Sequence, residues 1–248
     1  MQMQIEISPK RVRAYLAGAV VLDTVQARLV WENPHYPAYY IPRSDVREAL
    51  LVPSEHTSRS ETRGLARHFD VRVGERVAAR AAWQYDDSPE LRSLVRFEWG
   101  ALDAWFEEEE EVFVHPRDPH KRCDILHSSR HVVVSIGGVV LADTHRPTLL
   151  LETGLPPRYY VPKTDVRMDR LTAIEKRTGC AYKGFASYWV YAQNGKVVEP
   201  DVAWSYAHPL PDAVKIAGMI GFYNETLDIE VDGVRLDKPI TEFSRSQK

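Results

Sequence analysis

The chain contains one internal repeat, and this duplication constrains its fold more than any other feature. A shift of 120 positions places residues 12–66 on residues 132–186 without a gap, and 18 of the 55 aligned positions are identical. The agreement is closest between residues 39–47 (YYIPRSDVR) and 159–167 (YYVPKTDVR). A period of this length matches a whole small domain rather than a solenoid unit of about 20 to 50 residues. The 248 residues therefore predict two similar domains.

Both copies show short strands separated by turns. In the second copy, residues 132–136 (VVVSI) and 139–142 (VVLA) flank a two-glycine turn, which is a strong hairpin signal. Such segments recur about every 8–12 residues, and strands do not alternate with long helices. One short helix per copy is expected, at residues 211–221 and at a shorter counterpart, residues 89–95. The expected fold class is mostly β.

A polar stretch with two prolines, residues 115–127, joins the copies and is typical of a semi-rigid linker. We therefore expect one domain at residues 1–114 and a second at residues 128–248. Histidines and Cys123 in this stretch are of the types that bind metals, but their spacing matches no zinc pattern. No metal site is predicted.

Composition argues against several classes of protein. The net charge of −3 and the pI near 6.3, without a clustered basic stripe, argue against nucleic-acid binding. No apolar stretch reaches the roughly 18 residues of a membrane span, and no signal peptide is expected. Two cysteines, Cys123 and Cys180, cannot form a disulfide framework, so we expect a reducing, cytoplasmic location. The acidic run at residues 107–111 is typical of a solvated strand end or of a linker.

The copies differ sharply where residues 178–184 (TGCAYKG) stand in place of residues 58–64 (SRSETRG). A duplicated domain needs its core in both copies but its site in only one, so asymmetric positions are the better functional candidates. We take Lys183, Cys180 and Tyr182 as candidate catalytic residues. Desolvation could lower the pKa of Lys183, or its charge could hold an anionic ligand; a surface lysine at a turn is the alternative.

Cys180 would be a nucleophile only if a base or a cation lowered its pKa. A small buried hydrophobic side chain is the alternative interpretation, because no motif surrounds this cysteine. Tyr182 has no counterpart in the first copy, and together with Trp189 and Tyr223 it could form the wall of a pocket.

Charged candidates for ligand binding come from the segment that both copies share. Asp165 and Arg167 alternate on a strand-like stretch and would project to one face. There they would bind a polar ligand or form an ion pair with each other. Because the first copy keeps both residues as Asp45 and Arg47, a structural ion pair is the favoured interpretation.

Aromatic residues complete the candidate set. Trp204 and Tyr206 share one strand face and have twins in the first copy, which is typical of a core. Trp189 is replaced by Phe69 in the first copy, so it is the better candidate for a pocket wall. The aromatic residues that we expect to bind a ligand are Tyr160, Trp189, Trp204 and Tyr206.

Several motifs of the second copy occur in a recognisable order: residues 159–167 (YYVPKTDVR), 180–184 (CAYKG), 187–189 (SYW) and 203–206 (AWSY). Together with the junction at residues 113–119 (FVHPRDP), they resemble the DUF427 family in its two-domain form, over nearly the whole chain. The resemblance implies a compact all-β domain of coiled sheets, of the Mss4-like or β-tent type.

The central motif of that family is usually Cys-Pro-Tyr-Lys-Gly. Here Ala181 replaces the proline, and the first copy keeps only Gly64, with Arg63 in the lysine's place. The resemblance therefore implies a degenerate site in the first copy. Zinc-binding relatives of the fold use paired Cys-x-x-Cys motifs, which this chain lacks. The family carries a nucleotidyltransferase-type name, but no paired-carboxylate or glycine-rich phosphate motif accompanies it here, so no cofactor is assigned.

Two functions remain open at this point. The first is a cytoplasmic protein that binds or transforms a small molecule, anionic or neutral, in a pocket of the second copy. The second is a non-catalytic interaction module that uses an aromatic-rich surface. The sequence does not decide between binding and catalysis. A deep pocket would favour the first function, and a flat aromatic patch would favour the second.

Overall fold

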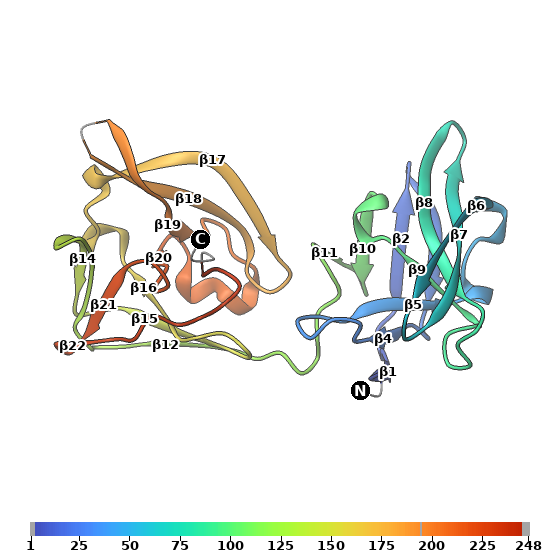
Figure 1. The fold of residues 1–248 in the computed structure, drawn as a ribbon, viewed down its shortest axis with the longest axis horizontal. Coiled ribbons are helices and arrows are strands. Elements are labelled where there is room, and N and C mark those ends of the chain that lie inside the picture. The colour runs from blue at the N-terminus through green and yellow to red at the C-terminus, as the bar shows by residue number, and fades with distance from the viewer. Residues whose placement is uncertain (1–2, 194, 245–248) are drawn as a thin grey trace. The chain divides into compact units, whose positions relative to one another are not determined.

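The computed structural model describes residues 3–193 and 195–244, and the chain divides into two compact units, Met1–Asp118 and Pro119–Lys248 (Figure 1). Each unit is built from antiparallel strands, so the expected mostly-β class and the duplication are confirmed. In the part of the chain that is described, each unit contains one seven-stranded and one four-stranded sheet.

The first unit orders its large sheet as β1 (Ile5–Ile7), β4 (Arg28–Val30), β5 (Ala38–Pro42), β9 (Leu94–Phe97), β8 (Arg76–Tyr85), β7 (Gly64–Val73) and β6 (Leu51–Ser60). Its small sheet follows the order β11 (Glu110–Val112), β10 (Ala104–Glu107), β2 (Val12–Leu16) and β3 (Ala19–Thr24). Short 3₁₀ helices lie between strands: η1 (Arg43–Asp45), η2 (Glu48–Leu50) and η3 (Trp99–Ala101).

The second unit repeats this topology. Its large sheet contains β12 (Cys123–His127), β15 (Thr148–Glu152), β16 (Arg158–Val161), β20 (Ile220–Phe222), β19 (Lys196–Ser205), β18 (Gly184–Gln193) and β17 (Leu171–Cys180). Its small sheet contains β14 (Val139–Thr144), β13 (Val132–Ile136), β21 (Asp228–Val231) and β22 (Val234–Arg235). The 3₁₀ helices are η4 (Lys163–Asp165), η5 (Met168–Arg170) and η6 (Pro211–Ile216).

Alternation along the strands gives the large sheet of the second unit two buried faces. Tyr159 and Ala203 belong to the core shared with the small sheet, whereas their chain neighbours Tyr160 and Trp204 belong to a second apolar cluster. That second cluster includes Ile216 of η6. The long strands β17, β18 and β19 curve over this unit in Figure 1. A residue's position along a strand therefore decides which of two distinct environments it enters.

Two expected elements differ in the structure. The helix expected at residues 211–221 is the shorter 3₁₀ helix η6, and residues 89–93 of the first unit form turns before β9 instead of a helix. The linker is shorter than the expected residues 115–127, because residues 123–127 form β12 and pair with β15. Ile125 is the one buried residue of this strand. With a single buried side chain, β12 has no apolar alternation that would predict a strand from the sequence.

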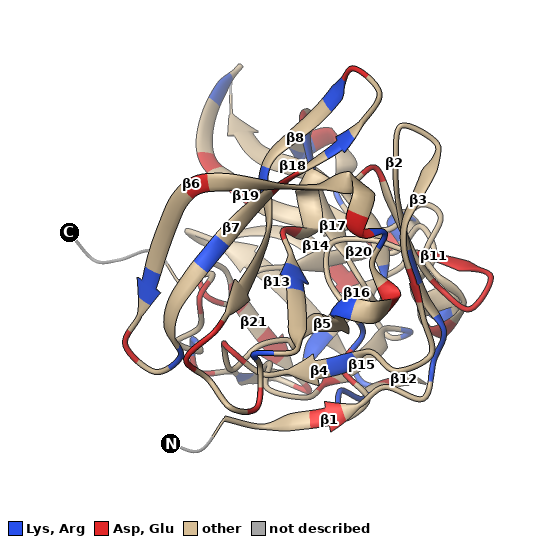
Figure 2. Ribbon diagram, turned by 90° about the vertical axis from the view of Figure 1, so that its right-hand side faces the viewer, with Lys and Arg blue, Asp and Glu red and all other residues tan. Residues whose placement is uncertain are grey.

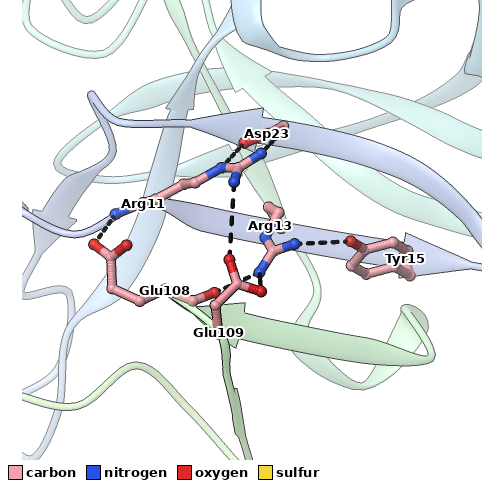
Figure 3. Close-up of polar contacts among 6 residues, drawn as sticks. All are labelled: Arg11, Arg13, Tyr15, Asp23, Glu108 and Glu109. Carbon is pink, nitrogen blue, oxygen red and sulfur yellow. Dashed lines mark hydrogen bonds and ion pairs between the residues drawn. The ribbon is translucent and has the colours of Figure 1, made fainter.

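Ion pairs hold the acidic run, residues 107–111, at the turn between β10 and β11. Arg13 Nη2 donates to Glu109 Oε2 at 2.8 Å, and the backbone amide of Arg11 donates to Glu108 Oε1 at 2.8 Å (Figure 3). Glu107 is buried, whereas the rest of the run is more exposed. The run therefore spans the end of β10, a turn and the start of β11, and its charge is partly balanced by β2 and the residue before it.

Along the strands drawn in Figure 2, basic and acidic residues are interspersed. No helix among residues 3–193 and 195–244 has the length and apolar character needed to cross a membrane. The folded units thus present mixed charge over antiparallel sheets.

Gly221 on β20 allows the Trp204 ring to lie directly against the backbone. A Cβ at this position would be 2.7 Å from Trp204 Cε2, whereas one at Gly100 would meet nothing within 4 Å. We expect Gly221→Ala to destabilise the second unit by about 1–3 kcal/mol through overpacking. Chemical denaturation followed by fluorescence measures this effect, with Gly100→Ala as control. Equal stability of the two variants would contradict this account of Gly221.

Candidate functional site

Lys183 lies in the turn between β17 and β18 and is buried, with 7% of its surface exposed. Gly184 follows it with φ of +91°, and Gly64 in the first unit has φ of +84°. Both copies keep this glycine because the hairpin turn needs a left-handed backbone. The turn directs Lys183 Nζ to Glu152, at the end of β15, to which it donates a hydrogen bond. The lysine is therefore one half of a buried ion pair rather than a surface lysine.

The charge of Lys183 is stabilised by its surroundings. Burial lowers the pKa of its ammonium group, but the nearby Cys180 and Glu152 raise it by more, so the net shift is upward. Of the interpretations left open for Lys183, the one with a lowered pKa is wrong, because the sequence did not reveal the carboxylate of Glu152. A lysine that stays protonated suits charge pairing better than general base catalysis.

Glu152 is the residue of this cluster that the sequence analysis did not select. Its first-unit twin, Glu32, lies 3.2 Å from Arg63 and also pairs with Arg96. An identical acid at the end of an apolar strand in both copies was the available signal. Since both units pair this carboxylate, buried in Glu152 and partly buried in Glu32, with a cation from the same hairpin turn, the pair belongs to the shared frame of the domain.

Cys123 and Cys180 lie half-buried beside this ion pair. Cys123 is opposite Glu152 in the β12–β15 register. Burial, followed by the charge of Glu152, raises the pKa of Cys123 to about 11, so its thiol is protonated at neutral pH. Tyr182 is half-buried in the adjacent turn, with Lys121 Nζ 6.0 Å from its ring centroid.

Tyr160, Trp204 and Tyr206 are buried in the second apolar cluster. Trp204 Nε1 donates to Tyr160 Oη at 2.9 Å, and the Trp204 ring centroid is 4.4 Å from that of Tyr223. Burial raises the pKa of Tyr160 and of Tyr206. These side chains fill the interior near Lys183 and satisfy one another, which is what aromatic core residues do.

Asp165 and Arg167 do not come together. Asp165 lies in η4 and accepts hydrogen bonds from Thr144 Oγ1 at 2.7 Å and from Arg146, while Arg167 pairs with Asp169. Hydrogen bonds from Arg146 and then Thr144 lower the pKa of Asp165. The expected strand with both side chains on one face was wrong, because a 3₁₀ turn rotates Asp165 toward β14.

Trp189 is on the other face of β18 from Tyr188, at the edge of the core shared with the small sheet. It is only half-buried, and it lines a cavity of about 430 Å³. The cavity is lined by Lys163, Ala173, Ile174, Glu175, Arg177, Ser187, Tyr188, Trp189, Ser205, Ala207, Gly218 and Ile220. Of the nine predicted site residues, Trp189 is thus the one in the cavity lining, and Lys183 is not in it.

In the first unit, side chains at the corresponding place contact one another. Strand pairing makes Phe69 the equivalent of Trp189 and Arg43 the equivalent of Lys163. The guanidinium of Arg43 lies over Phe69, with Cζ 4.7 Å from the ring centroid, and Nη1 donates to Gln84 Oε1 at 2.7 Å. Four lining positions are larger in the first unit: Arg67 for Ser187, Gln84 for Ser205, Asp86 for Ala207 and Ser93 for Gly218.

Within the described residues, no group of three or more His, Cys, Asp or Glu side chains is placed to hold a metal ion. The linker histidines are therefore not gathered into such a group in the described part of the chain.

A family model for a domain of unknown function (DUF427), also named NTP_transf_9, matches residues 4–108 and 124–233. The chain belongs to the DUF427 family. A comparison with curated proteins found no match. The two matched segments correspond to the two units, so each unit is one DUF427 domain, and the two-domain form is confirmed.

Removal of the carboxylate from this DUF427 protein's buried pair is a direct test of its structural role. We expect Glu152→Gln to destabilise the second unit by about 3–5 kcal/mol, because the Lys183 ammonium then stays buried without its counter-charge. Urea denaturation measures the loss. The control is Arg167→Gln, which breaks the exposed pair with Asp169 and should leave the midpoint unchanged. A Glu152→Gln midpoint equal to that of the wild type would refute the structural role.

Cys123 should resist alkylation at pH 8. Its pKa of about 11 leaves little thiolate at that pH, and burial limits access. Peptide mapping after a timed iodoacetamide pulse should show Cys123 modified much more slowly than an unfolded sample of the same chain. Equal rates in the folded and urea-unfolded protein would contradict the raised pKa.

Proposed function

We propose that the second DUF427 domain binds a small molecule in the cavity beside Trp189. The observation that carries the proposal is the contrast between the two units, which share topology but differ in how this place is filled. In the first unit the Arg43 side chain covers Phe69. In the second unit Trp189 instead borders open space.

The size and chemistry of the cavity support this proposal. Its volume of about 430 Å³ falls within the range typical of small-molecule sites, roughly 300–1,000 Å³. Trp189 and Ile220 provide apolar surface, and Ser187, Ser205, Lys163 and other polar groups converge on it. A mixture of apolar walls and a few polar groups favours a small ligand over a flat protein surface.

In this proposal the ion pair of Lys183 and Glu152 has a structural role. Lys183 and Glu152 anchor the β17–β18 hairpin, which carries Trp189 and Ser187. The cytoplasm remains the proposed location, because two cysteines cannot form a disulfide framework.

A variant that restores the first unit's side chains tests the site. We name the double exchange Lys163→Arg with Ser205→Gln the plug variant, because it reproduces Arg43 and Gln84. A thermal-shift screen of the full chain against nucleotides, sugar phosphates, carboxylates and aromatic compounds should give hits that the plug variant loses. At a hundredfold excess over the dissociation constant, binding stabilises the protein by about 2.7 kcal/mol.

The reverse exchange, Arg43→Lys with Gln84→Ser in the first unit, is the matched control and should keep the hits. Hits that persist in the plug variant, or no hit in the screen, would refute the proposal. In the second case an interaction module would become the better hypothesis.

A further inference from the structure

Resting on the proposed function, we infer that the ligand of this cavity is a one- or two-ring aromatic molecule with an anionic substituent. Its ring stacks on Trp189, and its carboxylate or phosphate pairs with Lys163 and Arg177. The inference comes from comparing what occupies this place in the first unit with what borders it in the second.

The first unit shows that this place accommodates a flat, delocalised group. The guanidinium of Arg43 is planar, and it lies over the Phe69 ring with Cζ 4.7 Å from the centroid. Trp189 offers a larger face at the equivalent position, and it is half-buried beside open space. A planar ring can stack there in the place of the guanidinium.

Both units have a polar side chain at the edge of this place, but its type differs. Gln84 Oε1 accepts a hydrogen bond from Arg43 at 2.7 Å in the first unit. The equivalent residue of the second unit, Ser205, is buried and lines the cavity together with Ser187. Their hydroxyl groups can donate to or accept from ring substituents.

The two units differ in whether an acid balances the cation at this place. In the first unit Glu48 pairs with Arg43, Nε to Oε2 at 3.1 Å, and balances its cation. The position of Glu48 is taken by Met168 in the second unit. The cavity therefore lacks the acid that balances a cation in the first unit.

Cations predominate on the rim of the cavity. Lys163 and Arg177 line it, and Glu175 is the one acidic side chain among the lining residues. Neither Lys163 nor Arg177 forms a side-chain ion pair with any described residue. Two cations without counter-charges beside one acid favour an anionic ligand, and an arginine suits the geometry of a carboxylate or a phosphate.

Matched pairs of probes separate the ring from the charge. We would titrate the full chain with indole-3-acetate and indole-3-acetamide, which share a ring, and with cyclohexylacetate, which keeps the charge without aromaticity. AMP and adenosine form the phosphate pair. We expect an anion to bind about ten- to a hundredfold more tightly than its neutral partner, as charge-assisted hydrogen bonds predict. Higher salt should reduce this difference.

Variants assign the difference to residues. Lys163→Gln and Arg177→Gln should each weaken the anion severalfold and leave the neutral ring unchanged. Trp189→Leu should weaken both members of a pair, and Trp189→Phe, which is the first unit's own residue, tests the same point with less risk to folding. Lys176→Gln, which removes an exposed cation already paired with Asp201, is the control and should change neither affinity.

The outcomes separate this inference from the proposed function. If neutral rings bind as tightly as anions, and the plug variant still abolishes both, the ligand class is wrong and the cavity remains a binding site. If cyclohexylacetate binds as well as indole-3-acetate, the stacking role of Trp189 is wrong. If no probe binds and the plug variant behaves as the wild type, both the inference and the proposed function are wrong.

Discussion

In each domain the position of a long hairpin depends on a carboxylate paired with a cation from the hairpin turn. In the second unit Glu152 ends β15, near one edge of the large sheet, while Lys183 lies in the turn between β17 and β18, the two strands at the opposite edge. A contact between these two regions fixes where the tip of the long hairpin rests. Such a pair is stabilising only as a pair, because either charge alone would be costly in this interior. The first unit has the same constraint through Glu32 and Arg63.

Because this constraint is the same in both units, differences elsewhere can be compared position by position. The strand orders coincide, and η1 and η2 follow β5 as η4 and η5 follow β16. What differs is the filling of one face beside β7 and β8 in the first unit and β18 and β19 in the second. Arg43 and Gln84 occupy that place in one unit, and in the other Lys163 and Ser205 border a cavity. The repeat thus supplies an internal reference for this site, with Arg43 over Phe69 in one unit and a cavity beside Trp189 in the other.

The sequence predicted the fold class and the duplication, because these depend on local patterns and on identities between the copies. It selected Lys183 as a candidate catalytic residue, and the structure places this residue in an ion pair with Glu152. It did not reveal that Glu152 would meet Lys183, since the two are 31 residues apart and strand order decides their contact. It selected Trp189 but not Ser187, Ser205, Ala207 or Gly218. Small residues form no recognisable pattern by themselves. They become informative only through the larger residues at equivalent positions of the first copy, which lie outside the gapless alignment. There the offset between the copies changes from 120 at Phe69 and Trp189 to 121 at Trp83 and Trp204.

An open cavity at this place lowers the stability of the domain, and the polar lining residues reduce that loss. Exchanging large side chains for small ones forfeits packing contacts, and an apolar void would cost stability in proportion to its volume. Hydroxyl groups, two cations and an acid border this cavity, so water can occupy it and satisfy those groups until a ligand replaces it. The strands that form the cavity are held by the ion pair of Lys183 and Glu152 and by the aromatic cluster around Trp204, which lie outside its lining except for Tyr188 and Ile174. The sheet can therefore tolerate the cavity, because the interactions that fix its strands are largely separate from the lining side chains that differ between the two units.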